Sequence, residues 1–192
     1  YFTNKSNTLA SIYIVRDPRN IVTSMSNHFN FDIDYSKKFI TTERSIGGNQ
    51  TIKASLMDNN IITILGAWNN HVLSWTQNNS NLLIIRYEDL VKDIELETDR
   101  LINFIKKYMN IEISRKKIQN CIESTSFKNL TKLEDSKNFT EVANKNIGTN
   151  KKFFYLGENN KWQKFLDKKT VEYLEIKFKK EMAKFGYLNQ LI

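Results

Sequence analysis

The sequence predicts an α/β protein in which a parallel β-sheet lies between two layers of helices. Two short apolar runs, 10–15 and 82–85, are continuous and rich in β-branched residues, as strands buried on both faces are. Each run ends in a polar cluster that a helical pattern follows, and a long connection separates the two runs. This alternation is typical of a three-layer fold with a parallel sheet flanked by helices.

The first run leads directly into a helix. Asp17 can cap this helix, and Pro18, the one proline of the chain, fits its first turn. Ligands of parallel sheets bind at the carboxyl ends of the strands, where helix N-termini present free N–H groups to anions. Arg16 and Ser24 lie at or just beyond this strand end, so the topology predicts an anion site near Arg16.

Further helices are predicted from apolar residues at helical spacing. They cover 65–75, 101–108, 114–123 and 171–185. Ser114 is expected to cap the third of these helices, and Gly186 is suited to end the last one. The polar stretch from 31 to about 60 carries no such pattern, and the residues from 131 to 160 are expected to form loops.

Composition predicts one globular domain over 1–192. Of the 192 residues, 40% are hydrophobic and 26% charged, and the net charge of +8 suits an anionic partner such as a nucleotide, a nucleic acid or an acidic membrane surface. No apolar run approaches the ~20 residues of a membrane-spanning helix. Cys121 is the single cysteine; we expect it to be buried in the core, in a reducing, cytoplasmic protein.

The segment 12–24, I-Y-I-V-R-D-P-R-N-I-V-T-S, resembles a segment of the sulfotransferase family. There a strand ends in V-R-D-P, and a serine follows eight residues after the arginine. The resemblance implies that Arg16 and Ser24 hold the 3′-phosphate of the donor 3′-phosphoadenosine 5′-phosphosulfate (PAPS), a task that suits a guanidinium and a hydroxyl. In the alternative interpretation, Arg16 pairs with Asp17 or another carboxylate and Ser24 is merely tolerated in its helix.

A second match combines a helix with a strand end. The helix from Trp68 to Trp75 and the run 82–90, L-L-I-I-R-Y-E-D-L, resemble the family's W-x-x-H-V-x-x-W helix and its Y-E-D-L strand end. The resemblance implies that Tyr87 contacts the adenine. The two tryptophans are expected to be core anchors first, with a substrate-pocket role as the alternative, and His71 is expected to be structural.

The third match is the segment 124–128, S-T-S-F-K, which resembles the family's T-S-F. It implies that Thr125 or Ser126 hydrogen-bonds the nucleotide and that Phe127 packs on the adenine, for which an aromatic face is suitable. The alternative is a helix-capping hydroxyl followed by a core phenylalanine.

The fourth match, over 153–162, is imperfect. It follows the spacing of the family's R-K-G-x-x-G-D-W, and Gly157 and Trp162 coincide with the family's glycine and tryptophan. The family's second glycine is Asn160 here, and its aspartate is Lys161.

The family's Arg-Lys pair, which also grips the 3′-phosphate, is replaced by Tyr155 and Leu156. Lys151 and Lys152 could supply the missing charge, the hydroxyl of Tyr155 could substitute for it, or donor affinity could be weaker.

The resemblance runs from about 11 to 188. It implies the sulfotransferase version of the P-loop-nucleotide-hydrolase-like fold, here lacking its first strand and phosphate loop. The family's P-K-S-G-T-T-W-type loop and its catalytic histidine, usually beside a lysine, precede the V-R-D-P strand. Gly47-Gly48 and His28 come too late to match them, so we expect the catalytic residues upstream of Tyr1 and read the chain as a fragment.

The resemblance implies a metal-independent sulfotransferase that uses PAPS, with a sugar, alcohol, amine or lipid as acceptor and no nucleic acid partner. The stretches 29–60 and 131–150 are expected to carry acceptor selectivity. Three alternatives are kept: a non-catalytic relative that binds PAPS or its product PAP, a small-molecule kinase, and a basic nucleic-acid-binding module. The sequence lacks the phosphate loop that a kinase would need, and it carries no recognisable nucleic-acid-binding signature.

Overall fold

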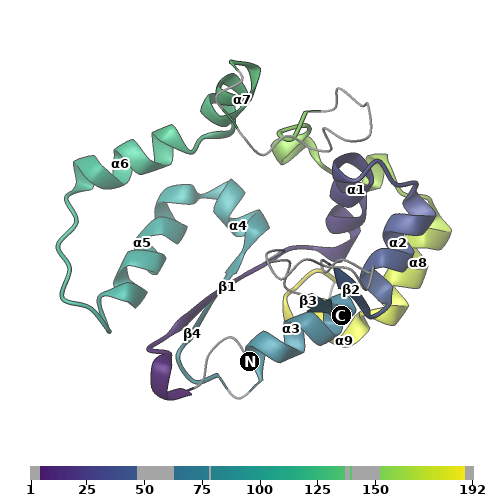
Figure 1. Cartoon of the computed structure of the whole chain (residues 1–192), viewed down its shortest axis with the longest axis horizontal. Coiled ribbons are helices and arrows are strands. Elements are labelled where there is room, and N and C mark those ends of the chain that lie inside the picture. The colour runs from purple at the N-terminus through teal and green to yellow at the C-terminus, as the bar shows by residue number, and fades with distance from the viewer. Residues whose placement is uncertain (1–4, 47–62, 78, 137–138, 140–151, 189–192) are drawn as a thin grey trace, which may run out of the picture.

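A computed structural model describes residues 5–46, 63–77, 79–136, 139 and 152–188. At its centre two strands, β1 (Ser11–Val15) and β4 (Leu82–Arg86), pair in parallel over their whole length. Ser11 lies opposite Leu82 and Val15 opposite Arg86, so both strands end at the same level (Figure 1). Both predicted strands are therefore confirmed, each within one residue of its expected bounds.

The prediction that helices cover both faces of the sheet is wrong for β1. On one face, Tyr13 and Val15 are buried in the core. On the other, Ile85 of β4 is 3% exposed, but Ile12 and Ile14 are 44% and 55% exposed. Among the described residues the parallel sheet has two strands, and the helices on this second side contact β4.

The core forms where five helices meet the first face of the sheet. They are α1 (Pro18–His28), α2 (Ile33–Thr41), α3 (Trp68–Thr76), α8 (Lys168–Lys177) and α9 (Lys179–Lys184). Figure 1 shows α1, α2 and α8 side by side on one side of the strands, and α1 contacts both α2 and α8. The buried apolar cluster comprises Tyr13, Val15, Val22, Ile40, Trp68, Val72, Leu174, Phe178, Met182, Phe185 and Tyr187.

The other helices lead away from the end of β4. In order they are α4 (Tyr87–Lys92), α5 (Ile94–Ile105), α6 (Arg115–Ser124) and α7 (Phe127–Asp135), each in contact with the next along α4–α5–α6–α7. Figure 1 shows this arm curving over the strand ends towards α1. The arm therefore brings α7 to the same end of the sheet as α1.

Several predicted boundaries change in the structure. Ser114 caps α6 as expected, but Cys121 is exposed rather than core, because the exposed face of α6 carries it. Leu65 belongs to β3 (Thr63–Leu65), which pairs antiparallel with β2 (Arg44–Ile46), and not to the following helix.

Two stretches expected to lack regular structure contain helices. The helix α2 lies in the first, where the side chain of Asp32 accepts a hydrogen bond from Tyr35 N at 2.6 Å. The helix α7 overlaps the second, which also holds a short 3-10 turn, η3 (Gly157–Asn159), and a further 3-10 turn, η4 (Trp162–Lys164), follows just beyond it. Another 3-10 turn, η1 (Lys5–Asn7), precedes β1.

The predicted C-terminal helix is divided into α8 and α9 at Phe178. Gly186 terminates this helix, as expected: it lies two residues beyond the end of α9 and adopts a left-handed conformation with φ +68°. Gly186 N bonds Ala183 O at 3.1 Å and Tyr187 N bonds Met182 O at 2.9 Å, a Schellman motif. This turn directs Tyr187 back towards the strand ends.

Across the described residues, no helix is both long and apolar enough to cross a membrane.

Candidate functional site

The candidate site begins where β1 and β4 end. Arg16 follows β1 and Tyr87 follows β4, and the guanidinium carbon of Arg16 lies 4.2 Å from the centroid of the Tyr87 ring. One step further, Asp17 N donates to Glu88 Oε1 at 3.1 Å and so joins the two chain segments beyond the last strand pair. Arg16 Nε is buried and has no hydrogen-bond partner among the described residues.

A cavity of about 740 Å³ opens beside Arg16, within the size range of small-molecule sites. Four segments that lie far apart in the sequence line it. Six of the eight residues predicted to bind the nucleotide are among its lining residues: Arg16, Ser24, Tyr87, Phe127, Tyr155 and Gly157. The fold thus brings together residues from all four matching segments.

The helix α1 forms one wall of the cavity. Asp17 caps its N-terminus through a bond from Arg19 N at 2.9 Å, with Pro18 in the first turn, as the sequence predicted. Ser24, Asn27 and His28 share one face of α1 by their spacing, and all three line the cavity.

The opposite wall is formed by Phe127 at the start of α7, packed against Gly157. A Cβ atom on Gly157 would lie 2.6 Å from the Phe127 ring, and Gly157 has φ +52°. A glycine is therefore required both by the backbone conformation and by the ring. Phe127 is 42% exposed, so the alternative interpretation of a core phenylalanine is wrong.

Thr125 and Ser126 are not among the residues that line the cavity. Thr125 Oγ1 donates to Cys121 O at 2.7 Å. The Ser126 hydroxyl caps α7 by accepting a bond from Asn129 N at 3.4 Å. Both hydroxyls thus hold the junction between α6 and α7, and their predicted contact with a nucleotide stays a prediction.

The cavity carries few cationic side chains. Among the described lining residues, Arg16 is the one arginine, and none is a lysine. Lys152 instead contacts Asp135 at 2.6 Å; the hydrogen bond and charge of this carboxylate raise the pKa of the lysine. Lys152 is not a lining residue, and Lys151 lies outside the described residues. The Tyr155 side chain, 56% exposed, lines the rim.

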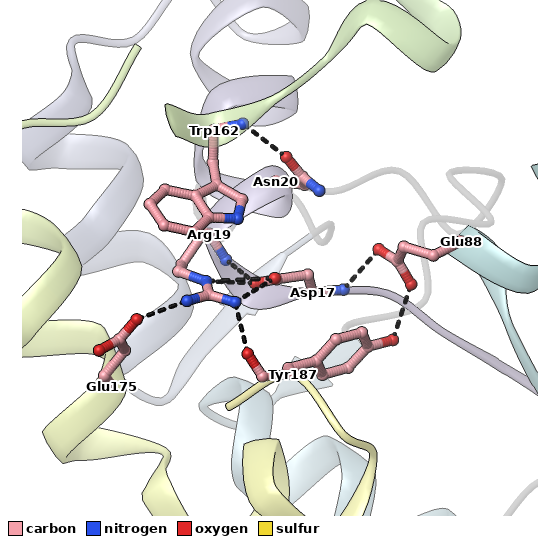
Figure 2. A network of polar contacts seen from close by, with 7 residues as sticks. All are labelled: Asp17, Arg19, Asn20, Glu88, Trp162, Glu175 and Tyr187. Atoms are coloured by element: carbon pink, nitrogen blue, oxygen red, sulfur yellow. Dashed lines mark hydrogen bonds and ion pairs between the residues drawn. The ribbon is translucent and has the colours of Figure 1, made fainter. Parts of the chain in front are cut away.

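The interpretation in which Arg16 pairs with Asp17 is wrong, because Arg19 holds that carboxylate. Arg19, 6% exposed, donates from Nε and Nη2 to Asp17 and from Nη2 to Tyr187 O at 2.7 Å. It also pairs with Glu175, and its guanidinium carbon lies 4.1 Å from the Trp162 ring centroid (Figure 2). Burial opposes the charge, but hydrogen bonds and charges of Asp17 and Glu175 outweigh it and raise the Arg19 pKa.

The same polar network reaches the C-terminal segment. The Tyr187 hydroxyl donates to Glu88 Oε2 at 2.9 Å, next to the bond that Glu88 accepts from Asp17 (Figure 2). Burial, together with the charge of Glu88, raises the pKa of Tyr187 far above its usual range. The available sequence signal for this network was the second arginine of R-D-P-R, which was not predicted as a site residue.

A second hollow of about 1380 Å³ lies beside the first, and Arg16, Tyr87, Gly157 and Asn160 line both. Arg86, which was not predicted as a site residue, lines the second hollow. Its Nε is buried without a hydrogen-bond partner in the part of the chain that the structure describes. Its position at a strand end was the available sequence signal.

His71 has a structural setting, as predicted. Its Nδ1 lies 3.0 Å from the Tyr13 hydroxyl, and burial lowers the pKa of the histidine. Trp68 is 7% exposed and forms part of the core, as expected, whereas Trp75 is 41% exposed and stacks on Tyr13. Within the described residues, no three His, Cys, Asp or Glu side chains are grouped closely enough to hold a metal ion.

Arg16, whose buried Nε has no hydrogen-bond partner among the described residues, lines a cavity at the carboxyl ends of two parallel strands, and this is the position at which α/β proteins bind phosphorylated ligands. The family model for the sulfotransferase domain matches residues 3–186. The chain therefore belongs to the sulfotransferase family.

Curated relatives agree with this assignment. The chain is 24% identical over 180 residues to sulfotransferase 1B1 of Canis lupus familiaris, covering 92% of this chain and 56% of that protein. It is 22% identical over 186 residues to the amine sulfotransferase of Oryctolagus cuniculus, covering 94% of this chain and 57% of that protein. The chain thus spans a little more than half the length of these relatives.

Solved structures show the same fold. Mouse sulfotransferase SULT7A1 complexed with PAP aligns with a TM-score of 0.59 at 20% identity, over 91% of this chain and 58% of that one. Retinol dehydratase in complex with androsterone and inactive cofactor PAP aligns with a TM-score of 0.61 at 18% identity, over 90% of this chain and 47% of that one. The described part of this chain is mainly helical around its two parallel strands.

Proposed function

We propose that this chain binds the 3′-phosphoadenosine part of PAPS and belongs to a sulfotransferase that acts on a hydroxyl or amine acceptor. The observation that carries the proposal is the convergence of four sequence segments on one cavity. Arg16, Tyr87, Phe127 and Gly157 each come from a different segment and line that cavity. A chance resemblance of four short motifs would not require them to meet in space.

The 3′-phosphate is assigned to Arg16 and Ser24. Arg16 Nε is buried without a partner among the described residues, and leaving a buried donor unpaired costs about 1–3 kcal/mol. A phosphate oxygen would satisfy it with a charge-assisted hydrogen bond. Tyr87, stacked on the guanidinium at 4.2 Å, fixes the plane in which its donors lie.

The adenine is assigned to the space beside Phe127 and Tyr87. Both rings line the cavity, and an aromatic face binds a base by stacking. Because Gly157 has no side chain, its backbone packs closely against the Phe127 ring. This contact supports the position of the ring. Thr125 would have to give up its bond to Cys121 O in order to donate to the nucleotide, whereas the Ser126 hydroxyl accepts from Asn129 N and keeps its own hydrogen for such a contact.

The donor, when bound, supplies the sulfuryl group, and residues of this chain bind and orient its nucleotide. The acceptor class follows from the relatives, which include an amine sulfotransferase and a 3-alpha-hydroxysteroid sulfotransferase. Parts of the stretches expected to select the acceptor, 47–60 and 140–150, lie outside the described residues, as do Gly47 and Gly48. We also propose a cytoplasmic location, on the evidence of the single cysteine.

A second candidate is a sulfotransferase-like protein that binds PAP or PAPS without turnover. It is favoured by Tyr155 and Leu156, which line the cavity where the family pattern has an arginine and a lysine. Binding with no sulfuryl transfer by the full-length protein would distinguish it.

Titration calorimetry with PAP tests the proposal. AMP, which lacks the 3′-phosphate, and the Arg16→Met variant are each expected to reduce affinity about 30-fold or more, since a charge-assisted hydrogen bond contributes roughly 2 kcal/mol. Arg115→Met removes the same charge from an exposed site on α6 and is expected to leave PAP binding unchanged.

Equal affinity for PAP and AMP would contradict the assignment of the 3′-phosphate. Titration with a DNA duplex at two salt concentrations tests the nucleic-acid alternative, in which duplex binding is tight and falls steeply with salt.

A further inference from the structure

Asn160 occupies the position at which the resemblance places a glycine. It follows η3, is 7% exposed and lines both hollows. A buried amide side chain is costly unless its donor and acceptor are both paired. The contacts of Asn160 therefore indicate why this chain carries an amide there.

Both ends of the Asn160 amide contact α1. Asn160 Nδ2 donates to Asn20 O at 3.1 Å, and the Thr23 hydroxyl lies 2.5 Å from Asn160 Oδ1. The single hydrogen of that hydroxyl has a second acceptor, Asn20 O, at 2.9 Å. The amide thus connects the segment 157–162 to the first half of the helix that also carries Ser24.

Contacts on either side of Asn160 extend this connection. On the C-terminal side, Trp162 N donates to Asn20 Oδ1 at 2.9 Å and the Trp162 ring lies over Arg19 (Figure 2). On the N-terminal side, Gly157 packs against Phe127. The segment therefore bridges α1 and α7, the two walls of the cavity.

We propose that Asn160 is a positioning residue, which sets the spacing between Ser24 on α1 and Phe127 on α7. This inference rests on the proposed function, in which the 3′-phosphate binds one wall and the adenine the other. A ligand that spans two walls binds more tightly when their spacing is fixed before binding. A ligand that uses mainly one wall gains less from that preorganisation.

The test compares Asn160→Gly with Asn159→Gly. Asn159 is the exposed neighbour and does not line the cavity, so the second variant makes the same chemical change without removing the bonds to α1. Asn160→Gly is expected to weaken PAP binding about tenfold, which corresponds to about 1.4 kcal/mol, because the bond from Nδ2 to Asn20 O and the contact with Thr23 are both lost. Asn159→Gly is expected to bind within about twofold of the wild type, as surface substitutions usually do.

The ratio of PAP to AMP affinity separates positioning from a general loss of structure. A partly unfolded variant loses affinity for both nucleotides equally, whereas Asn160→Gly is expected to lower the ratio. Thr23→Val removes the contact between the Thr23 hydroxyl and Asn160 from the α1 side. In the Asn160→Gly background, this substitution is expected to weaken PAP binding less than it does in the wild type, because the two changes remove a shared contact.

PAP binding by Asn160→Gly within twofold of the wild type, or an unchanged ratio, overturns the positioning role while leaving the proposed function intact. A wild-type chain that does not bind PAP instead overturns the proposed function and this inference with it. The wild-type titration therefore comes first and separates the two failures.

Discussion

Arg16 and Arg19 stand three residues apart in the same R-D-P-R segment, yet their surroundings differ. Arg19 is almost fully buried and its donors go to Asp17, Glu175 and Tyr187 O. Arg16 stacks on Tyr87, and its buried Nε has no partner among the described residues. One guanidinium joins segments of the fold, and the other is available to an anion.

The position of each arginine relative to the start of α1 explains this difference. Arg16 lies between the end of β1 and the N-cap residue Asp17, where it contacts Tyr87. Arg19 lies in the first turn of α1, where its guanidinium reaches back to Asp17 and across to α8 and Tyr187 O. The strand ends therefore present a cationic face, Arg16, to the cavity and a paired face, formed by Asp17 and Arg19, to α8 and Tyr187.

The largest expected effect breaks the paired face. Arg19→Met leaves Asp17 buried without its cation, and removing one partner of a buried ion pair costs about 3–5 kcal/mol. We expect the free energy of unfolding in urea to fall by that amount. Arg16→Met is expected to change it by less than about 1 kcal/mol. Equal losses in the two variants would contradict the division of roles.

A second change sharpens the cationic face. Tyr155→Arg combined with Leu156→Lys places two positive charges at the cavity and is expected to raise PAP affinity about tenfold, as measured by calorimetry. The control is Leu96→Arg with Met109→Lys, which adds the same charges at exposed apolar positions outside the lining residues. A similar gain in the control would mean that net charge, rather than local contact, sets the affinity.

Glycines at positive φ offer a smaller test of the cavity wall. Gly157→Ala and Gly186→Ala introduce a Cβ at φ +52° and +68°, respectively, and each is expected to cost at least about 1 kcal/mol of stability in urea unfolding, with the larger loss in Gly157→Ala, whose Cβ would lie 2.6 Å from the Phe127 ring. Only Gly157→Ala should also weaken PAP binding, because its Cβ meets the Phe127 ring, whereas that of Gly186 meets only Arg86 Nη1 at 3.8 Å. Loss of binding in Gly186→Ala would point to a general effect on the fold.

The smallest effect concerns pH. Burial lowers the folded-state pKa of His71 below its ordinary 6.5, so the unfolded state takes up a proton first as the pH falls. The contribution of neutral His71 is therefore present above pH 6.5 and is lost as the pH falls through the folded-state pKa. We expect the melting temperature of His71→Gln to depend less on pH between 7 and 5 than that of the wild type. Parallel curves would show that another group dominates this range.

The sequence by itself determined the local structure and the composition of the site. Continuous β-branched runs predicted β1 and β4, Asp17 and Ser114 marked helix starts, and Gly186 marked the last helix end, because each depends on nearby residues. Four local motifs also predicted which residue types form the site, and six of the predicted residues line the cavity, although the meeting of the four motifs in space is a property of the tertiary fold.

Only the tertiary structure decided which polar groups are paired. Neighbouring sequence left two interpretations of Arg16 open, one of them a pairing with Asp17, but the carboxylate of Asp17 belongs to Arg19, whose other partners lie 156 and 168 residues away. Asn160 likewise reads as a departure from a glycine pattern until α1 is seen beside it. The exposure of Ile12, Ile14 and Cys121 was also missed. Burial and pairing depend on contacts between distant segments, and local patterns do not encode those contacts.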